Sequence, residues 1–98
     1  MKLARKYSFD TYGAGRSTIV TLKNSFHGRT METLTATGQD ELHQYFDPFP
    51  PGFRYAAAND LDALKAAIDE TVCAVMMEPV QGEGGVQPLD ADLCTRLQ

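Results

Sequence analysis

Hydrophobic residues along this chain alternate between short continuous runs and stretches in which they recur at helical spacing. Short runs bounded by turn-forming residues predict strands at 17–22, 53–57 and 72–79, and the first of them is β-branched and typical of a buried parallel strand. Stretches with apolar residues at helical spacing predict helices, at 2–12, 29–37, 61–68 and 90–98. The predicted strands and helices therefore alternate along the sequence.

This alternation predicts an α/β fold, because strand, crossover helix and strand build a parallel sheet with helices on both faces. We expect a partial three-layer domain with a small parallel sheet of about three strands. The segment 39–51 is predicted to be irregular, since its three prolines interrupt regular pairing. The first helix has no capping residue before it and the last has none after it, so residues 1–98 are expected to be a single partial domain of a larger one.

Composition narrows the functional classes. The net charge is −4 and the nine Lys and Arg residues are scattered, so nucleic acid is not an expected partner. The longest apolar run, 72–77, is far shorter than the roughly 20 residues that cross a bilayer, and no signal peptide opens the chain. Cys73 and Cys94 lie in no metal-binding pattern. We expect a cytoplasmic protein with no membrane contact, no metal site and no disulfide.

The first group of candidate site residues follows the first predicted strand. Ligands in open α/β sheets bind beyond the carboxyl ends of the strands. The loop 24–30 places Phe26, His27, Gly28 and Arg29 at such an end. An aromatic ring and a guanidinium so close together can stack on a flat ring and bind a carboxylate through two hydrogen bonds.

The second group follows the third predicted strand, in the loop 78–85. Glu78 and Glu83 lie on either side of Gln81, and three of the last four residues are glycines. The loop matches neither a P-loop nor a dinucleotide-binding turn, so a phosphate cradle is not predicted here. Three glycines within four positions indicate a turn with a demanding backbone path.

Taken one at a time, these side chains also have ordinary explanations. An aromatic residue is used at least as often for core packing, and a lone arginine, histidine or glutamate in a loop is commonly just solvated. These explanations apply to Phe26, Arg29, His27, Glu78 and Glu83.

Taken together, the residues carry a recognisable pattern. Segments 19–30, IVTLKNSFHGRT, and 76–86, MMEPVQGEGGV, resemble two signature segments of the class III aminotransferases, which depend on pyridoxal phosphate. The acetylornithine and succinylornithine branch is matched in order and spacing by Ala36-Thr37-Gly38 and by Pro48-Phe49 with Gly52-Phe53. The resemblance implies the large domain of the fold type I pyridoxal-phosphate transferases, with the first strand between the second and third.

The resemblance also implies roles for single residues. Phe26 would stack on the pyridine ring of the cofactor, with His27 and Glu78 beside it, and Arg29 would bind the α-carboxylate of the substrate. Glu83 would pair with a distant arginine while a side-chain amine is bound, and would release that arginine to the carboxylate of 2-oxoglutarate.

The implied parent enzyme transfers an amino group from N-acetylornithine, or a related diamine, to 2-oxoglutarate in arginine biosynthesis. Amino acids and 2-oxo acids would be its substrates, and it would act as a homodimer. The family's Schiff-base lysine and its pyridinium-pairing aspartate correspond to no residue here, and neither does the phosphate-binding segment. We therefore expect no catalytic residue in this chain, doubtful cofactor binding and no activity from these 98 residues alone.

Two alternatives stay open. The chain could be a free-standing, non-catalytic α/β binding or interaction module that has kept the fold. It could also belong to an ornithine or 4-aminobutyrate aminotransferase, because these enzymes share much of the same loops. His27 favours the acetylornithine branch, since tryptophan is expected at that position in ornithine aminotransferases.

Overall fold

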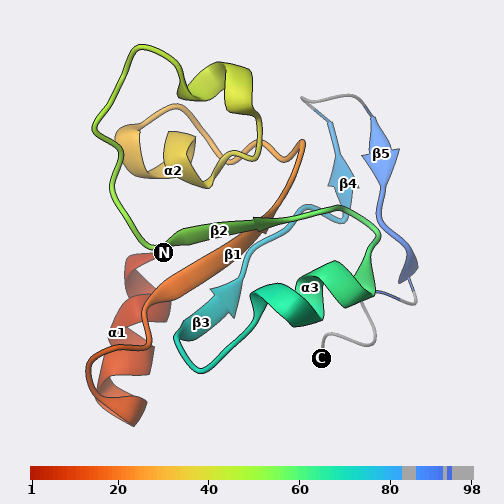
Figure 1. The fold of residues 1–98 in the computed structure, drawn as a ribbon. Coiled ribbons are helices and arrows are strands. Elements are labelled where there is room, and N and C mark those ends of the chain that lie inside the picture. The colour runs from red at the N-terminus through yellow and green to blue at the C-terminus, as the bar shows by residue number, and fades with distance from the viewer. Residues whose placement is uncertain (83–85, 92, 94–98) are drawn as a thin grey trace.

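The computed structural model describes residues 1–82, 86–91 and 93 (Figure 1). Its elements in chain order are α1 (Lys2–Tyr12), β1 (Thr18–Leu22), α2 (Met31–Ala36), the short 3-10 helix η1 (Asp40–His43), β2 (Phe53–Ala56), α3 (Leu61–Ala67), β3 (Val72–Val75), β4 (Val80–Gln81) and β5 (Gln87–Pro88). Every strand and helix predicted within the first 75 residues is present, with shorter bounds in most cases. Most of the helix predicted at 90–98 lies outside the described residues.

The main sheet has three parallel strands in the order β2-β1-β3. Ile19 of β1 is opposite Phe53 of β2 on one side and Ala74 of β3 on the other. The expected α/β class and the central position of the first strand are therefore confirmed. Because the strands are parallel, their carboxyl ends meet at one edge, where the loops after β1 and β3 lie side by side.

Burial of β1 on both faces holds this sheet together. Val20 and Leu22 pack with Leu64 of α3 in the main hydrophobic cluster, and all three are fully buried. Ile19 and Thr21 point to the opposite face, because side chains alternate along a strand, and they are buried as well. α1 and α3 stand on either side of the sheet in Figure 1. A continuous β-branched run was the right signal for such a strand.

The helices between the strands begin at residues that their sequences mark as caps. Asp60 accepts a hydrogen bond from the backbone N–H of Ala63 at the start of α3, as predicted. Thr30 and Thr33 form a reciprocal capping box at the start of α2. These caps fix where the chain leaves each loop and turns back towards the sheet.

The prediction for 72–79 was wrong in its second half. β3 ends at Val75, and Val80–Gln81 instead pairs antiparallel with Gln87–Pro88 as a separate two-stranded sheet. The backbone N–H of Met76 still bonds to the carbonyl of Val20 at 2.9 Å, but beyond it the chain leaves the ladder. The apolar pattern does not reveal where β3 ends, because Met76 and Met77 are still hydrophobic although they lie beyond the strand.

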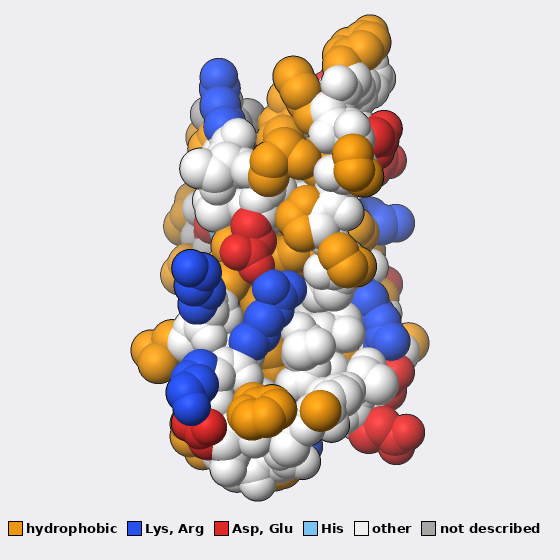
Figure 2. Space-filling model, turned by 90° about the vertical axis from the view of Figure 1, so that its left-hand side faces the viewer, with side chains coloured by type: hydrophobic (Ala, Val, Ile, Leu, Met, Phe, Trp, Pro, Cys, Tyr) orange, Lys and Arg blue, Asp and Glu red, His pale blue; other side chains and the backbone are white. Residues whose placement is uncertain are grey.

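One face of the molecule presents hydrophobic side chains to solvent. Figure 2 shows this face, with such side chains gathered over its upper half, where the segment after η1 passes. Tyr45 and Phe46 in that segment are 90% and 55% exposed. α1 also exposes apolar side chains, namely Leu3, Tyr7, Phe9 and Tyr12. Clusters of this kind are typical of surfaces that contact other protein.

The described residues contain no helix long and apolar enough to cross a membrane. Within the same ranges, no group of three or more histidine, cysteine or carboxylate side chains is placed to hold a metal ion. Cys73 is a free thiol, and Cys94 lies outside the described residues.

Candidate functional site at the carboxyl end of the parallel sheet

The two loops singled out in the sequence meet at the carboxyl edge of the sheet. A carboxylate oxygen of Glu78, after β3, accepts a hydrogen bond from the backbone N–H of Phe26, after β1, at 2.9 Å. The side-chain amide of Gln81 donates to the carbonyl of Lys23 at 3.2 Å, and this glutamine is fully buried. Side chains from the second loop thus tie down the backbone of the first.

A third segment holds the first loop from its other side. The 37–39 segment, Thr37-Gly38-Gln39, directly follows α2. The carbonyl of Gly38 accepts from the N–H of Asn24 at 2.7 Å, and the N–H of Gly38 donates to the hydroxyl of Ser25 at 3.0 Å. The hydroxyl of Thr37 accepts from the N–H of His27, and the side chain of Gln39 donates to the carbonyl of Ser25, both at 3.0 Å.

Gly38 can come this close because it has no side chain. It forms an isolated parallel bridge with Lys23, just beyond the end of β1. A β-carbon at position 38 would lie 2.1 Å from the carbonyl oxygen of Leu22 and 2.9 Å from the α-carbon of Lys23, and both are backbone atoms. The glycine is therefore required for the contact between the 37–39 segment and the loop.

Phe26 and Arg29 lie together on this fixed backbone. The guanidinium carbon of Arg29 is 5.9 Å from the centre of the Phe26 ring. Phe26 is half-buried and Arg29 is exposed. Arg29 forms no ion pair within the described ranges, so its fork of N–H groups is available to an anionic ligand.

His27 is next to this pair, in surroundings that disfavour the charged form of its imidazole. Burial lowers the pKa of its imidazole below the usual 6.5, and the nearby Glu78 carboxylate opposes that shift only in part. Its Nε2 atom is buried and has no hydrogen-bond partner among the described residues. A neutral ring with one unpaired nitrogen is able to contact a bound ligand.

Four of the five predicted site residues are thus brought together by contacts on the carboxyl side of the sheet. Phe26, His27 and Arg29 share one loop, and Glu78 reaches that loop from the other. Glu83 lies outside the described residues. The sequence did not reveal that Glu78 bonds to the backbone of Phe26, because the two residues are 52 positions apart.

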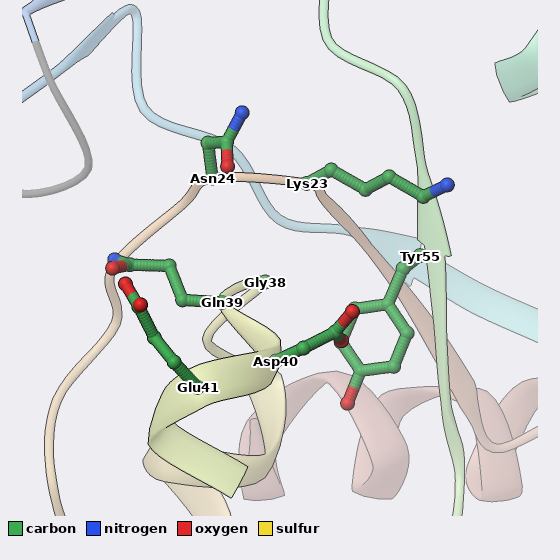
Figure 3. Close-up of a pocket in the computed structure, with 7 residues that line it drawn as sticks. All are labelled: Lys23, Asn24, Gly38, Gln39, Asp40, Glu41 and Tyr55. Carbon is green, nitrogen blue, oxygen red and sulfur yellow. The ribbon is translucent and has the colours of Figure 1, made fainter.

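A cavity that was not predicted opens beside the end of β1 (Figure 3). Its volume is about 670 Å³, and it is lined by Lys23, Asn24, Gly38, Gln39, Asp40, Glu41 and Tyr55. Figure 3 shows Lys23 and Asn24 on one side and the acidic side chains of η1 on the other. Burial, with a contribution from Asp40, raises the pKa of the Tyr55 hydroxyl. Phe26, His27, Arg29 and Glu78 do not line this cavity, so it is separate from the predicted site.

Comparison with known proteins identifies a family over the whole chain. The model of the family described as "Aminotransferase class-III" matches residues 1–98. The acetylornithine aminotransferase of Haemophilus ducreyi is 58% identical over 91 residues, which cover 92% of this chain and 23% of that protein. The acetylornithine aminotransferase of Caldanaerobacter subterraneus is 55% identical over 86 residues, or 88% of this chain and 22% of that protein. The chain therefore spans less than a quarter of the length of these relatives.

Solved structures agree in fold. The ornithine aminotransferase of Toxoplasma gondii ME49 superposes with a TM-score of 0.86 at 31% identity, over 97% of this chain and 23% of that one. A transaminase from the marine bacterium Virgibacillus superposes with a TM-score of 0.89 at 29% identity, over 98% of this chain and 24% of that one. The arrangement of this chain is thus one that transaminases share.

Replacing Gly38 with alanine tests the close approach of the 37–39 segment. The added β-carbon collides with backbone, so we expect Gly38→Ala to lower the free energy of unfolding by about 1–3 kcal/mol. Gly82→Ala is the matched control, because nothing lies within 4 Å of a β-carbon there, and its effect should stay within about 0.5 kcal/mol. Urea unfolding measures both values, and equal losses in the two variants would contradict the account.

Titration of the His27 imidazole tests its predicted surroundings directly. An NMR titration of its imidazole should give a pKa below 6.5, and Glu78→Gln should lower this pKa further by removing the charge that favours protonation. The pKa of His27 is about 6.5 in the unfolded chain and lower in the folded chain, so the unfolded chain takes up the proton at a higher pH. Protonation of His27 therefore favours unfolding, and the fold becomes less stable as the pH falls below about 6.5. A pKa at or above 6.5, or a rise in Glu78→Gln, would rule out this arrangement.

Proposed function

The chain belongs to the class III aminotransferase family, and from this premise we propose that it forms part of the cofactor-binding large domain of an aminotransferase. Enzymes of this family depend on pyridoxal phosphate. The proposed reaction transfers an amino group from N-acetylornithine, or a related diamine, to 2-oxoglutarate in arginine biosynthesis. The observation that carries the proposal is the Phe26 and Arg29 pair, fixed at the carboxyl edge of the sheet.

The residues present fit the flat ring of this cofactor. Phe26 offers a half-buried aromatic surface, and His27 has a buried nitrogen without a described partner. Pyridoxal phosphate, when bound, supplies the electron sink for the chemistry. The part of this chain is to hold and orient: Phe26 would stack on the ring, His27 would contact its edge, and Glu78 would keep Phe26 in place through its backbone N–H.

Arg29 is the residue that we propose for substrate recognition. Its planar fork of donors matches a carboxylate, and it forms no ion pair in the described part of the chain. N-acetylornithine and 2-oxoglutarate each carry a carboxylate at the end of the molecule away from the reacting carbon, so one arginine can bind both substrates. Glu83 is proposed to govern the exchange between the two substrates through a distant arginine.

The choice of amino donor rests on two observations. The relatives at 58% and 55% identity are acetylornithine aminotransferases, whereas the ornithine aminotransferase structure is 31% identical. Position 27 is a histidine, which favours the same branch. The homodimeric state and cytoplasmic location of the whole enzyme are part of the same proposal and rest on the family resemblance.

We also propose that these 98 residues alone do not catalyse transamination. None of the four lysines, Lys2, Lys6, Lys23 and Lys65, corresponds to the family's Schiff-base position. Without that lysine and the aspartate that pairs with the pyridine nitrogen, the cofactor has no group to anchor and activate it.

A chimera tests the proposed function. Residues 1–98 would replace the matching segment of the Haemophilus ducreyi acetylornithine aminotransferase, to which 92% of the chain aligns. We expect the chimera to convert N-acetylornithine and 2-oxoglutarate, and the isolated 98 residues to be inactive. In the chimera, Arg29→Lys keeps the charge but loses the fork, and should raise KM for both substrates by about 10- to 100-fold.

The outcomes separate the alternatives. A chimera that prefers ornithine to N-acetylornithine would contradict the proposed amino donor and would favour an ornithine aminotransferase. A folded chimera that takes up pyridoxal phosphate but transfers no amino group would contradict the proposed function. Activity in the isolated chain would contradict the proposal that the 98 residues are inactive alone.

A further inference from the structure

Thr37 lies at the end of α2, yet its side chain is directed at the loop that carries the proposed site residues. We propose that Thr37 is a positioning residue, which sets the placement of Arg29 relative to Phe26 through the two residues between them. This inference rests on the proposed function, because it assigns Thr37 a part in binding the substrate carboxylate. Thr37 is hydrogen-bonded to the backbone of His27 and Gly28, and it acts through these two residues.

The hydroxyl of Thr37 joins three backbone groups. It accepts a hydrogen bond from the N–H of His27 at 3.0 Å. Its own proton can go to the carbonyl of Gly28 at 3.3 Å or to that of Thr33 at 3.0 Å. The residue is fully buried, so no water replaces the hydroxyl if it is removed.

Between Phe26 and Arg29 the backbone passes close to Thr33 of α2 at Gly28. Gly28 has φ at +129°, a conformation that side chains resist, and a β-carbon there would lie 2.5 Å from the hydroxyl oxygen of Thr33. Phe26 is held by Glu78 on the other side. Glu78 holds the backbone at Phe26 and Thr37 holds it at His27 and Gly28, so the stretch 26–28 sets where the backbone of Arg29 begins beside the ring.

A neighbouring threonine shows that this use of the hydroxyl is particular to Thr37. Thr35 belongs to the same helix and is also buried, with 6% of its surface exposed. Its hydroxyl donates to the carbonyl of Met31 in its own helix at 2.6 Å and makes no bond to the loop. Thr35 is therefore a matched control for the loss of a buried threonine hydroxyl.

Misplacement of Arg29 has a specific kinetic signature. A carboxylate that stays bound throughout the reaction is held equally in the ground state and the transition state, so weaker binding raises KM and leaves kcat nearly unchanged. We expect Thr37→Val, which keeps the shape and removes the hydroxyl, to raise KM for both the amino donor and 2-oxoglutarate on the order of tenfold. Thr37→Ser restores the hydroxyl and should restore both KM values.

The experiment compares Thr37→Val, Thr37→Ser and Thr35→Val in the chimera described above. The expected result is a rise in both KM values for Thr37→Val alone, with kcat within about twofold and with rescue by serine. Equal KM values for Thr37→Val and Thr35→Val in an active chimera would overturn the inference. A general loss of kcat and stability in Thr37→Val would also overturn it, because that is the mark of a purely structural residue.

A second measurement uses the unsubstituted 98-residue chain and separates this inference from the proposed function. The backbone amide of His27 should exchange with solvent as slowly as that of Phe26, because the two are paired with Thr37 and Glu78. Fast exchange at His27 with slow exchange at Phe26 overturns the role of Thr37. An inactive chimera together with slow exchange at both amides rejects the proposed function and leaves the anchoring by Thr37 standing.

Discussion

A loop that leaves a buried strand must find partners for its backbone N–H and C=O groups, and in this chain that constraint builds the candidate site. The strand β1 is buried on both faces, so the residues after it emerge among other protein groups. Their partners come from the 37–39 segment on one side and from Glu78 on the other. The contacts that satisfy the backbone also fix the ring and the guanidinium.

Local sequence was enough to predict the elements that depend on local physics. The β-branched run of β1 marks a strand with two buried faces, and Asp60 marks the start of α3 through its capping hydrogen bond. The sequence also predicted that Phe26 and Arg29 lie in a ligand-binding loop after β1, because ligands of parallel sheets bind beyond the carboxyl ends of the strands. The sequence thus indicated which residues lie at the carboxyl edge of the sheet.

The hydrogen bonds within the candidate site join residues that are distant in the sequence, and the hydrophobic pattern did not predict them. The hydrogen bond from the N–H of Phe26 to Glu78 and the bond from Gln81 to Lys23 each link segments more than 50 positions apart. The hairpin of β4 and β5 was missed for a different reason: its paired residues are only six to eight positions apart, but the stretch 72–79 looks like one continuous strand. The cavity beside Tyr55 and η1 also forms only when the segments come together.

The central claim is that the loop 24–29 is rigid because both sides of its backbone are paired. Backbone ¹⁵N relaxation of the 98-residue chain tests it most directly, since order parameters report motion on the fast timescale that a loose loop would show. The account predicts values of about 0.85 for Asn24 through Gly28, equal to those of β1. Values below about 0.6 over these residues, with β1 still ordered, would contradict it.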